Sequence, residues 1–256
     1  MLVLASLGLF DEKDLTIRGL EEAKKADRVF IELYTSKWHG NLKNLEKMIG
    51  KKVEVLHRKD LEEDSGKILE EAKERYVVIL TQGDCLVQTT HSVLIQDAKK
   101  LGIETKVIHN ASIISVVAET GLHPQKFGPY LTIPFPEKTK GKMPESVYEI
   151  IKMNRSRGLH TLCLLDVIEE ENKYMLPHEA MRILLDMEDK RKENVFTSDT
   201  TAMVFAKAGS ENPLIIFDKV KNLLKKDLKE LPAVLIIPGT LHFTEKEHLL
   251  LLCSGK

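Results

Sequence analysis

The stretch Val77-Val-Ile-Leu-Thr-Gln-Gly-Asp84 joins a continuous apolar run to a Gly-Asp turn. A short run of β-branched residues and leucine is typical of a strand buried on both faces, as in a parallel sheet. Residues His91–Leu101 follow with apolar side chains at helical spacing. The order of strand, turn and helix indicates an α/β fold that binds ligands where its strands end.

The same alternation continues on both sides of this stretch. Amphipathic segments such as Leu15–Ala26 separate short apolar runs, and strands that alternate with helices favour a mostly parallel, doubly wound sheet. The further strands predicted in this half are Leu2–Ala5, Arg28–Glu32, Lys52–Leu56 and Glu104–His109.

Residues Pro124–Pro144 interrupt the alternation, because they are rich in proline and carry Lys138, Lys140 and Lys142 without a helical apolar stripe. Such a segment predicts a connection, an edge strand or a mobile loop. The pattern resumes with helix Glu145–Arg157, strand Thr161–Val167, helix Pro177–Lys192, strand Ala202–Lys207, helix Asp218–Leu228 and strand Ala233–Pro238. We therefore expect two α/β domains, residues 1–119 and 120–256.

The composition of the 256 residues excludes several classes of protein. Lys and Arg total 38 and Asp and Glu total 39, so no global basic field exists to hold a nucleic acid. No apolar run of 18 residues or basic leader is present, which argues against a membrane protein. The three cysteines, Cys85, Cys163 and Cys253, are scattered, as is typical of a reducing compartment, and we expect a cytoplasmic protein.

The lysine-rich segment Lys219–Lys229 has two interpretations. It predicts a surface helix that buries Val220, Leu223 or Leu224 and Leu228, with its lysines in solvent. The alternative is a basic patch that binds an anion.

Four segments place small or polar residues after a predicted strand, where open α/β sheets bind ligands. Gly8 would let the backbone approach a ligand or simply end a strand, and Asp84 would accept hydrogen bonds from a ligand or from its own turn. Ser112 would cap a helix over Ile113–Glu119, and His242 would serve as a base, a ligand contact or a packing residue. The segments are Ser6–Phe10, Thr81–His91, His109–Ser115 and Pro238–Glu245.

Common catalytic motifs are missing from the sequence. It has no Walker A loop, no H-E-x-x-H helix and no G-x-S-x-G elbow, and its histidines lack metal-ligand spacing. The residues alone therefore predict a two-domain α/β protein that binds a small ligand at its strand ends.

The four segments, in this order, resemble those of the diphthine synthase family, in the tetrapyrrole-methylase-fold class of S-adenosylmethionine-dependent methyltransferases. The resemblance covers nearly the whole chain. It is carried by Leu7–Thr16, Ile31–Ser36, Gly83-Asp84, Leu86-Val87, Thr89–His91, Ile108–Ile113, Thr120–His123, Arg157–Thr161, Val195–Thr200, Ala206–Ser210 and Pro238–His242.

This resemblance implies a specific reaction. The family transfers methyl groups from S-adenosylmethionine to the amino group of a 3-amino-3-carboxypropyl histidine on elongation factor 2, and three N-methylations give diphthine in diphthamide biosynthesis. It also implies a homodimer that needs no metal and holds the donor in the cleft between two α/β domains. The implied donor contacts are Leu9, Asp84, Val87, Ser112, Ile113, Leu164, Ala208 and His242.

The chain departs from the family at three positions. The family usually has Gly at position 6 and Pro at positions 82 and 85, where this chain has Ser6, Gln82 and Cys85. We expect Ser6 to narrow the donor pocket. The loss of each proline costs about 0.5–1 kcal/mol if the native backbone suits proline. Asp84 is retained.

Two alternatives stay open at this point. One is a methyltransferase of the same fold that acts on a corrin or uroporphyrin, and the other is a non-catalytic protein that binds elongation factor 2. Methyl transfer requires orientation more than protein chemistry, so we expect Asp84 and His242 to position the donor, and no residue predicts a dedicated base. The lysines of residues 134–144 would either dock the protein substrate or lie in a plain connection.

Overall fold

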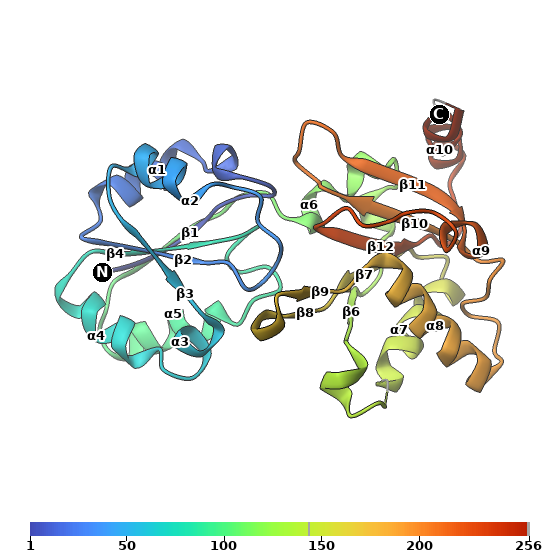
Figure 1. Ribbon diagram of the computed structural model, residues 1–256, viewed down its shortest axis with the longest axis horizontal. Helices are drawn as coiled ribbons and strands as arrows, with labels where there is room; N and C mark the ends of the chain where they lie inside the picture. Colours follow the sequence, from blue (N-terminus) through green and yellow to red (C-terminus); the bar gives the residue numbers. More distant parts are fainter. Residues whose placement is uncertain (143, 255–256) are drawn as a thin grey trace. The chain divides into compact units, whose positions relative to one another are not determined.

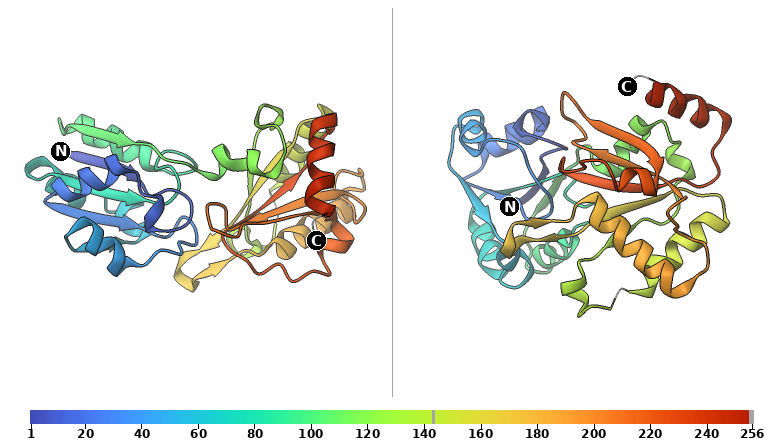
Figure 2. Two further views of the ribbon diagram at one scale, coloured as in Figure 1. Left: turned by 90° about the horizontal axis from the view of Figure 1, so that it is seen from above. Right: turned by 45° about the vertical axis from the view of Figure 1, so that its right-hand side comes forward.

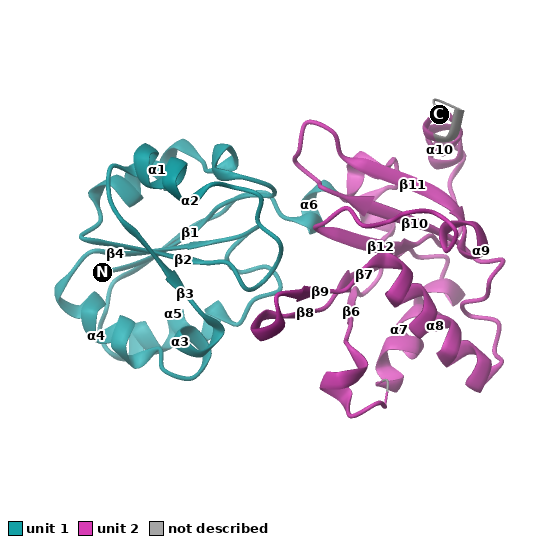
Figure 3. Cartoon of the chain, viewed as in Figure 1, with its two compact units in different colours: residues 1–116 teal, residues 117–256 magenta. Residues whose placement is uncertain are grey.

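The computed structural model describes residues 1–142 and 144–254 (Figure 1). Residues 143 and 255–256 lie outside this description, and so does the side chain of Cys253. The predicted segment Pro124–Pro144 contains residue 143, and the predicted domain 120–256 contains all of these residues. Contacts divide the chain into unit 1, Met1–Val116, and unit 2, Val117–Lys256 (Figure 3). The predicted border after residue 119 lies close to this division, and that each unit is a separate domain stays a prediction.

Unit 1 contains a five-stranded parallel sheet in the order β3-β2-β4-β1-β5. Helices cover both faces, α1 and α2 on one and α3, α4 and α5 on the other (Figure 1). The predicted parallel, doubly wound sheet is confirmed here. The strands are β1 (Leu2–Ser6), β2 (Arg28–Glu32), β3 (Val53–Leu56), β4 (Val77–Thr81) and β5 (Thr105–Ile108). The helices are α1 (Ile17–Lys25), α2 (Leu42–Ile49), α3 (Arg58–Glu62), α4 (Gly66–Glu74), α5 (His91–Lys100) and α6 (Ile113–Val116).

The apolar runs of unit 1 form central strands because successive side chains enter two separate cores. In β1, Leu2 and Leu4 belong to one cluster of buried side chains, whereas Val3 and Ala5 belong to the other. Side chains alternate across a strand, so a strand covered on both faces needs apolar residues at every position. Every residue of β1 is accordingly buried.

Unit 2 contains a second five-stranded sheet, in the order β11-β10-β12-β7-β6. Only β6 and β7 are parallel, and the other three pairs are antiparallel. The α/β prediction is confirmed, but a mostly parallel sheet is wrong for this half. The strands are β6 (Leu131–Ile133), β7 (Thr161–Leu165), β10 (Thr201–Ala206), β11 (Leu214–Lys219) and β12 (Ala233–Ile237), with a small hairpin of β8 (Val167–Ile168) and β9 (Lys173–Tyr174). The helices are α7 (Glu145–Ser156), α8 (Pro177–Arg191), α9 (Val220–Leu223) and α10 (Phe243–Ser254) (Figure 2).

The predicted helix Asp218–Leu228 is mostly wrong. Strand β11 occupies the first two of its residues because Leu214–Lys219 pairs with β10 in a complete hairpin register. The hairpin turn uses left-handed backbone at Lys207 and Gly209. Only α9 is helical in the predicted range, yet Val220, Leu223 and Leu228 are buried, as expected.

The proline-rich segment contains the edge strand β6 and two single turns of 3-10 helix, η3 (Pro124–Lys126) and η4 (Pro136–Thr139). Lys138 in η4 forms an ion pair with Asp166 at 2.8 Å, so this lysine holds the segment in place. The remaining 3-10 turns are η1 (Glu12–Asp14), η2 (Val117–Thr120) and η5 (Glu169–Glu171). Of the helices in the described residues, none has the length and apolar character needed to cross a bilayer.

Candidate functional site

Three of the four predicted ligand segments meet at one edge of the parallel sheet. Strands β1, β4 and β5 are neighbours, and the register pairs Ser6 with Thr81 and Ala5 with Ile108. All three strands therefore end together, and the loops that follow them lie at the carboxyl edge of the sheet. Open α/β sheets bind ligands at this edge.

Gly8 and Gly83 bring two of these loops into direct contact. Their main chains exchange two hydrogen bonds, from Gly8 N to Gly83 O at 3.1 Å and from Gly83 N to Gly8 O at 2.7 Å. Both residues have positive φ, 87° and 70°. A Cβ on Gly8 would lie 2.6 Å from Cβ of Asp14, which is too close for any side chain. Gly8 therefore does more than end a strand.

The carboxylate of Asp84 joins the loop after β4 to the loop after β5. Oδ2 accepts hydrogen bonds from His109 Nδ1 at 2.9 Å and from the Asn110 amide at 3.2 Å, and Oδ1 accepts one from the Leu86 amide at 3.0 Å. The side chain is buried. Both carboxylate oxygens thus have protein partners, including the turn bond expected from its own loop.

Asn110 is a further residue of this site that the sequence did not single out. Its side-chain NH₂ donates to the main-chain oxygens of Ser6 at 3.3 Å and Asp14 at 2.9 Å. Its side-chain oxygen accepts from the Ala111 amide at 2.8 Å. Asn110 therefore connects the loop after β5 to the loop after β1. The signal was present, since Asn110 lies within the motif Ile108–Ile113.

The other donor contacts predicted for unit 1 lie in these same loops. Leu9 follows Gly8 and is half-buried, and the Val87 amide donates to the Asp84 carbonyl at 3.0 Å. Ser112 is buried, and a Cβ built on Gly83 would lie 3.9 Å from its Cβ. The structure thus brings Asp84, Val87 and Ser112 together.

Ile113 begins α6, but the predicted helix over Ile113–Glu119 is wrong in part. The α-helix has only four residues, and the 3-10 turn η2 follows it. The main chain of Ser112, rather than its hydroxyl, bonds here, because its amide donates to Ser115 Oγ at 3.0 Å and its carbonyl accepts from Ser115 Oγ at 2.8 Å.

The three departures from the family have clear structural positions. The Ser6 hydroxyl accepts a hydrogen bond from the Cys85 amide at 2.9 Å, and both residues are fully buried. The hydroxyl therefore faces the loop after β4. Gln82 is buried, and its side-chain NH₂ donates to the Lys37 carbonyl at 3.1 Å. Each polar replacement thus gains a bond inside unit 1.

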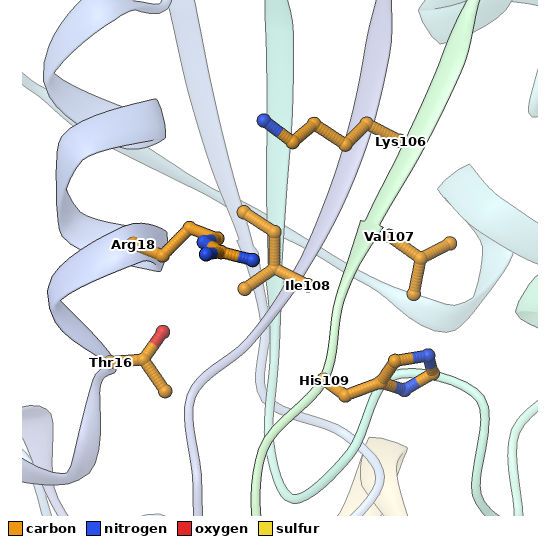
Figure 4. Close-up of a pocket in the computed structure, with 6 residues that line it drawn as sticks. All are labelled: Thr16, Arg18, Lys106, Val107, Ile108 and His109. Carbon is orange, nitrogen blue, oxygen red and sulfur yellow. The ribbon is translucent and has the colours of Figure 1, made fainter.

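A pocket of about 400 Å³ lies beside this edge, between the start of α1 and the edge strand β5 (Figure 4). The side chains of Lys106 and Ile108 extend toward α1, and those of Val107 and His109 extend to the other side (Figure 4). Lys106 pairs with Glu22 at 3.3 Å, and His109 bonds to Asp84. The residues that line the pocket are Thr16, Arg18, Lys106, Val107, Ile108 and His109.

The three donor contacts predicted for unit 2 do not all lie at one end of its sheet. Leu164 on β7 lies opposite Val234, the second residue of β12. Ala208 follows β10 by two residues, at the end where Ala206 pairs with Ala233. The structure therefore brings Leu164 and Ala208 to the same end of the sheet. His242 instead lies five residues beyond the end of β12, at the opposite end of the sheet.

His242 lies next to Glu245, a buried carboxylate that gathers four hydrogen bonds. Oε2 accepts from the His242 amide at 2.7 Å and from Lys126 Nζ at 2.6 Å. Oε1 accepts from the His123 amide at 2.8 Å and from His160 Nε2 at 2.9 Å. Burial alone would raise the pKa of Glu245, but these donors lower it to about 2. We call this arrangement the Glu245 cluster.

The Glu245 cluster also fixes the protonation of His160. The Gly239 amide donates to His160 Nδ1 at 2.9 Å, so this nitrogen carries no proton and Nε2 donates to Glu245. Burial lowers the pKa of His160, although Glu245 acts in the opposite direction. The ring is therefore neutral. The motifs Thr120–His123 and Arg157–Thr161 contain two members of the cluster, but no sequence signal identified Glu245.

The rings of His123 and His242 lie at the exposed side of the Glu245 cluster. Their centroids are 5.4 Å apart, and Thr244 Oγ1 lies 3.1 Å from His123 Nε2 and 2.8 Å from His242 Nδ1. Among the described side chains, which leave out those of residues 143 and 253–256, no group of three or more His, Cys, Asp or Glu residues is arranged to hold a metal ion.

Comparisons with known proteins agree with this architecture. The family of Tetrapyrrole (Corrin/Porphyrin) Methylases matches residues 1–236. Diphthine synthase of Methanocaldococcus jannaschii is 45% identical over 258 residues, covering 100% of both chains, and that of Methanococcus maripaludis strain S2 is 42% identical over 97% of each.

Solved structures give the same result. A crystal structure of diphthine synthase superposes with a TM-score of 0.85 at 35% identity, covering 97% of this chain and 94% of that one. A putative diphthine synthase from Entamoeba histolytica superposes with a TM-score of 0.89, also at 35% identity, covering 98% and 97%. The chain therefore belongs to the tetrapyrrole methylase family, among its diphthine synthases.

Proposed function

We propose that this protein transfers methyl groups from S-adenosylmethionine to the amino group of the 3-amino-3-carboxypropyl histidine on elongation factor 2. Three such transfers give diphthine, on the route to diphthamide. The observation that carries the proposal is the 45% identity to a diphthine synthase over the full length of both chains. The methyltransferase class follows from the same similarity and from the family match over residues 1–236.

Each unit contains residues that we propose as donor contacts. In unit 1 they are Leu9, Asp84, Val87, Ser112 and Ile113, at the carboxyl edge of the parallel sheet. In unit 2 we propose Leu164 and Ala208, which lie at the same end of the sheet, whereas His242 lies at the opposite end and is less suited to contact the same donor. The close approach of Gly8 and Gly83 supports the first group, since it leaves backbone rather than side chains beside Asp84. Because both carboxylate oxygens of Asp84 already have protein partners, its main part is to hold this edge in shape.

The reaction requires positioning above all. The lone pair of the acceptor nitrogen attacks the methyl carbon, the new N–C bond forms as the C–S bond breaks, and the sulfur leaves uncharged. Holding the three atoms in line contributes about 7–11 kcal/mol to catalysis. Each transfer leaves a positive charge on nitrogen, so a proton must leave before the next transfer. An apolar environment lowers the pKa of an amine and favours this loss.

Elongation factor 2 is the proposed partner, and a cytoplasmic homodimer is the proposed form of the enzyme. We expect Lys140 and Lys142 to bind elongation factor 2, because both side chains are exposed directly after η4. Lys138 is less suited to docking because it already pairs with Asp166 at 2.8 Å. Replacing Lys140 and Lys142 by Ala should raise the KM for elongation factor 2 without changing binding of the donor.

The test is a calorimetric titration with S-adenosylhomocysteine, followed by the mass of elongation factor 2 after reaction with S-adenosylmethionine. We expect saturable binding that is weakened in Asp84→Ala, and a mass increase of one to three methyl groups on the factor. A shifted absorption band with a free tetrapyrrole, and no mass increase, would indicate a corrin or uroporphyrin substrate instead. Binding of the factor without methylation would indicate a non-catalytic role.

A further inference from the structure

The loop after β4 bends around one residue, Cys85, whose main chain bonds to three side chains. The Cys85 amide donates to Ser6 Oγ at 2.9 Å. The Cys85 carbonyl accepts from Thr89 Oγ1 at 2.6 Å and faces His91 Nδ1 at 3.1 Å. We call these four residues the Cys85 junction.

The Cys85 junction holds the part of the loop that the glycine pair does not reach. The two bonds between Gly8 and Gly83 fix the start of the loop. Residues 82–90 contain no helix or strand, and Gln88 adopts a left-handed backbone with φ of 59°. A segment without regular structure keeps its shape only through such local bonds. The second half of the loop therefore depends on the junction together with the bonds from the Leu86 and Val87 amides to Asp84.

Two proposed donor contacts flank the junction. Asp84 precedes Cys85 directly, and the Val87 amide donates to the Asp84 carbonyl at 3.0 Å. A displacement of the Cys85 main chain would thus move the Asp84 carboxylate and the Val87 backbone together. Both must stay in place for a ligand at this sheet edge.

His91 is a fixed member of the junction. Its ring is buried, and burial lowers its pKa, so the ring is neutral. A carbonyl oxygen only accepts, so Nδ1 carries the proton and donates to Cys85. Together with Thr89 and Ser6, it satisfies every main-chain hydrogen-bonding group of a fully buried residue.

We propose that Ser6, Thr89 and His91 are positioning residues for the methyl donor, acting through the Cys85 main chain on Asp84 and Val87. This inference rests on the proposed function, because it concerns the same donor site. It also explains what Ser6 contributes, since its hydroxyl supplies the acceptor that the buried Cys85 amide requires.

Two adjacent threonines provide a matched test. Thr89→Val removes the hydroxyl that donates to Cys85, whereas Thr90→Val removes a hydroxyl that lies 3.3 Å from Glu62 instead. In a calorimetric titration with S-adenosylhomocysteine, we expect the Kd to rise about tenfold in Thr89→Val and to stay within about twofold of the parent in Thr90→Val. Thr89→Ser keeps the hydroxyl and should restore the parent value.

Kinetics separates positioning from a general loss of structure. Thr89→Val should raise the KM for S-adenosylmethionine and leave kcat at saturating donor unchanged. Ser6→Ala tests the other side of the junction by the same readouts if Thr89→Val fails to fold. Equal Kd values for Thr89→Val and Thr90→Val would overturn this inference and leave the proposed function intact. A parent protein that binds no S-adenosylhomocysteine would overturn the proposed function itself.

Discussion

The two units use a buried carboxylate in different ways. In unit 1, Asp84 bonds to groups at most 26 residues away, and main-chain bonds between Gly8 and Gly83 and the side-chain amide of Asn110 support the same edge. In unit 2, Glu245 collects donors up to 122 residues away, one of them the cation Lys126. The sheet edge of unit 1 distributes its hydrogen bonds over several loops, whereas the Glu245 cluster concentrates four of them on one carboxylate. A single substitution should therefore do more damage in unit 2.

The single tryptophan makes this comparison measurable. Trp38 is the only one in the chain and belongs to unit 1. Its fluorescence reports the unfolding of unit 1, while circular dichroism reports both units. A loss of stability can thus be assigned to one unit.

Removal of Glu245 should have the largest effect. Glu245→Ala removes the acceptor of the buried His160 and one of the two acceptors of the half-buried Lys126, and breaking a buried ion pair from one side costs about 3–5 kcal/mol. The free energy of unfolding, measured by urea titration with circular dichroism, should fall by this amount. Glu247→Ala, an exposed position on the same helix, is the matched control and should change little. A comparable shift of the Trp38 transition would contradict separate domains.

Acid should remove part of the stabilisation that Glu245 provides. The folded-state pKa of Glu245 is lowered to about 2 from an ordinary 4.5, so its contribution is complete above pH 4.5 and is lost as the pH falls toward 2. His160, whose pKa is also lowered, adds a loss that begins below its ordinary value of 6.5. Unfolding free energies measured between pH 7 and 3 should fall, and Glu245→Gln should reduce the slope below pH 4.5. An unchanged slope would remove Glu245 as the cause.

Glycine substitution compares a crowded with an open left-handed position in unit 1. Gly8→Ala adds a Cβ 2.6 Å from Asp14 Cβ at a φ of 87°, and we expect a loss of about 2–4 kcal/mol. Gly50 has a φ of 77° with open space around it, so Gly50→Ala should lose only about 1 kcal/mol. The Trp38 fluorescence transition measures both. Equal losses would mean that the Gly8–Gly83 contact relaxes easily.

The smallest effect should come from the Ser6–Cys85 pair. Ser6→Gly leaves the buried Cys85 amide without an acceptor and should cost about 1–2 kcal/mol. Cys85→Pro removes the amide, so the double variant Ser6→Gly/Cys85→Pro should recover most of this loss. A double-mutant cycle on the Trp38 transition measures the coupling. Strictly additive losses would show that the two departures from the family do not compensate each other.

The sheet of unit 1 could be predicted because every strand carries its own signal. Strand β2 has the predicted limits Arg28–Glu32, and the apolar run that starts at Val77 forms β4, which ends just before the Gly-Asp turn. The unit 2 sheet could not be predicted in the same way, because Leu214–Lys219 joins β10 through a hairpin whose turn begins at Lys207. Because Asp218 and Lys219 were predicted as part of a helix, the strand that contains them and its antiparallel pairing with β10 were not predicted.

The residues of the candidate site also differ in how well the sequence predicted them. Asp84 and Ser112 were predictable because each follows a recognisable strand. The role of Glu245 was not predictable, because it depends on contacts with His123 and His160, which lie 122 and 85 residues away. The family resemblance identified the motifs around these histidines without indicating what joins them. A single buried carboxylate in a helix whose described side chains are mostly exposed has no local signature.

The strand order of unit 1 also bears on how the chain is made. Strand β1 precedes the other strands of unit 1 and is synthesised before them, yet it pairs only with β4 and β5. Translation at 5–20 residues per second needs roughly 4–14 s to add residues 7–76, which precede β4. During this time Leu2–Ser6 has no partner strand, although β2 and β3 are already able to pair. The nascent chain thus carries an unpaired apolar segment that must be shielded until the middle of its sheet is synthesised.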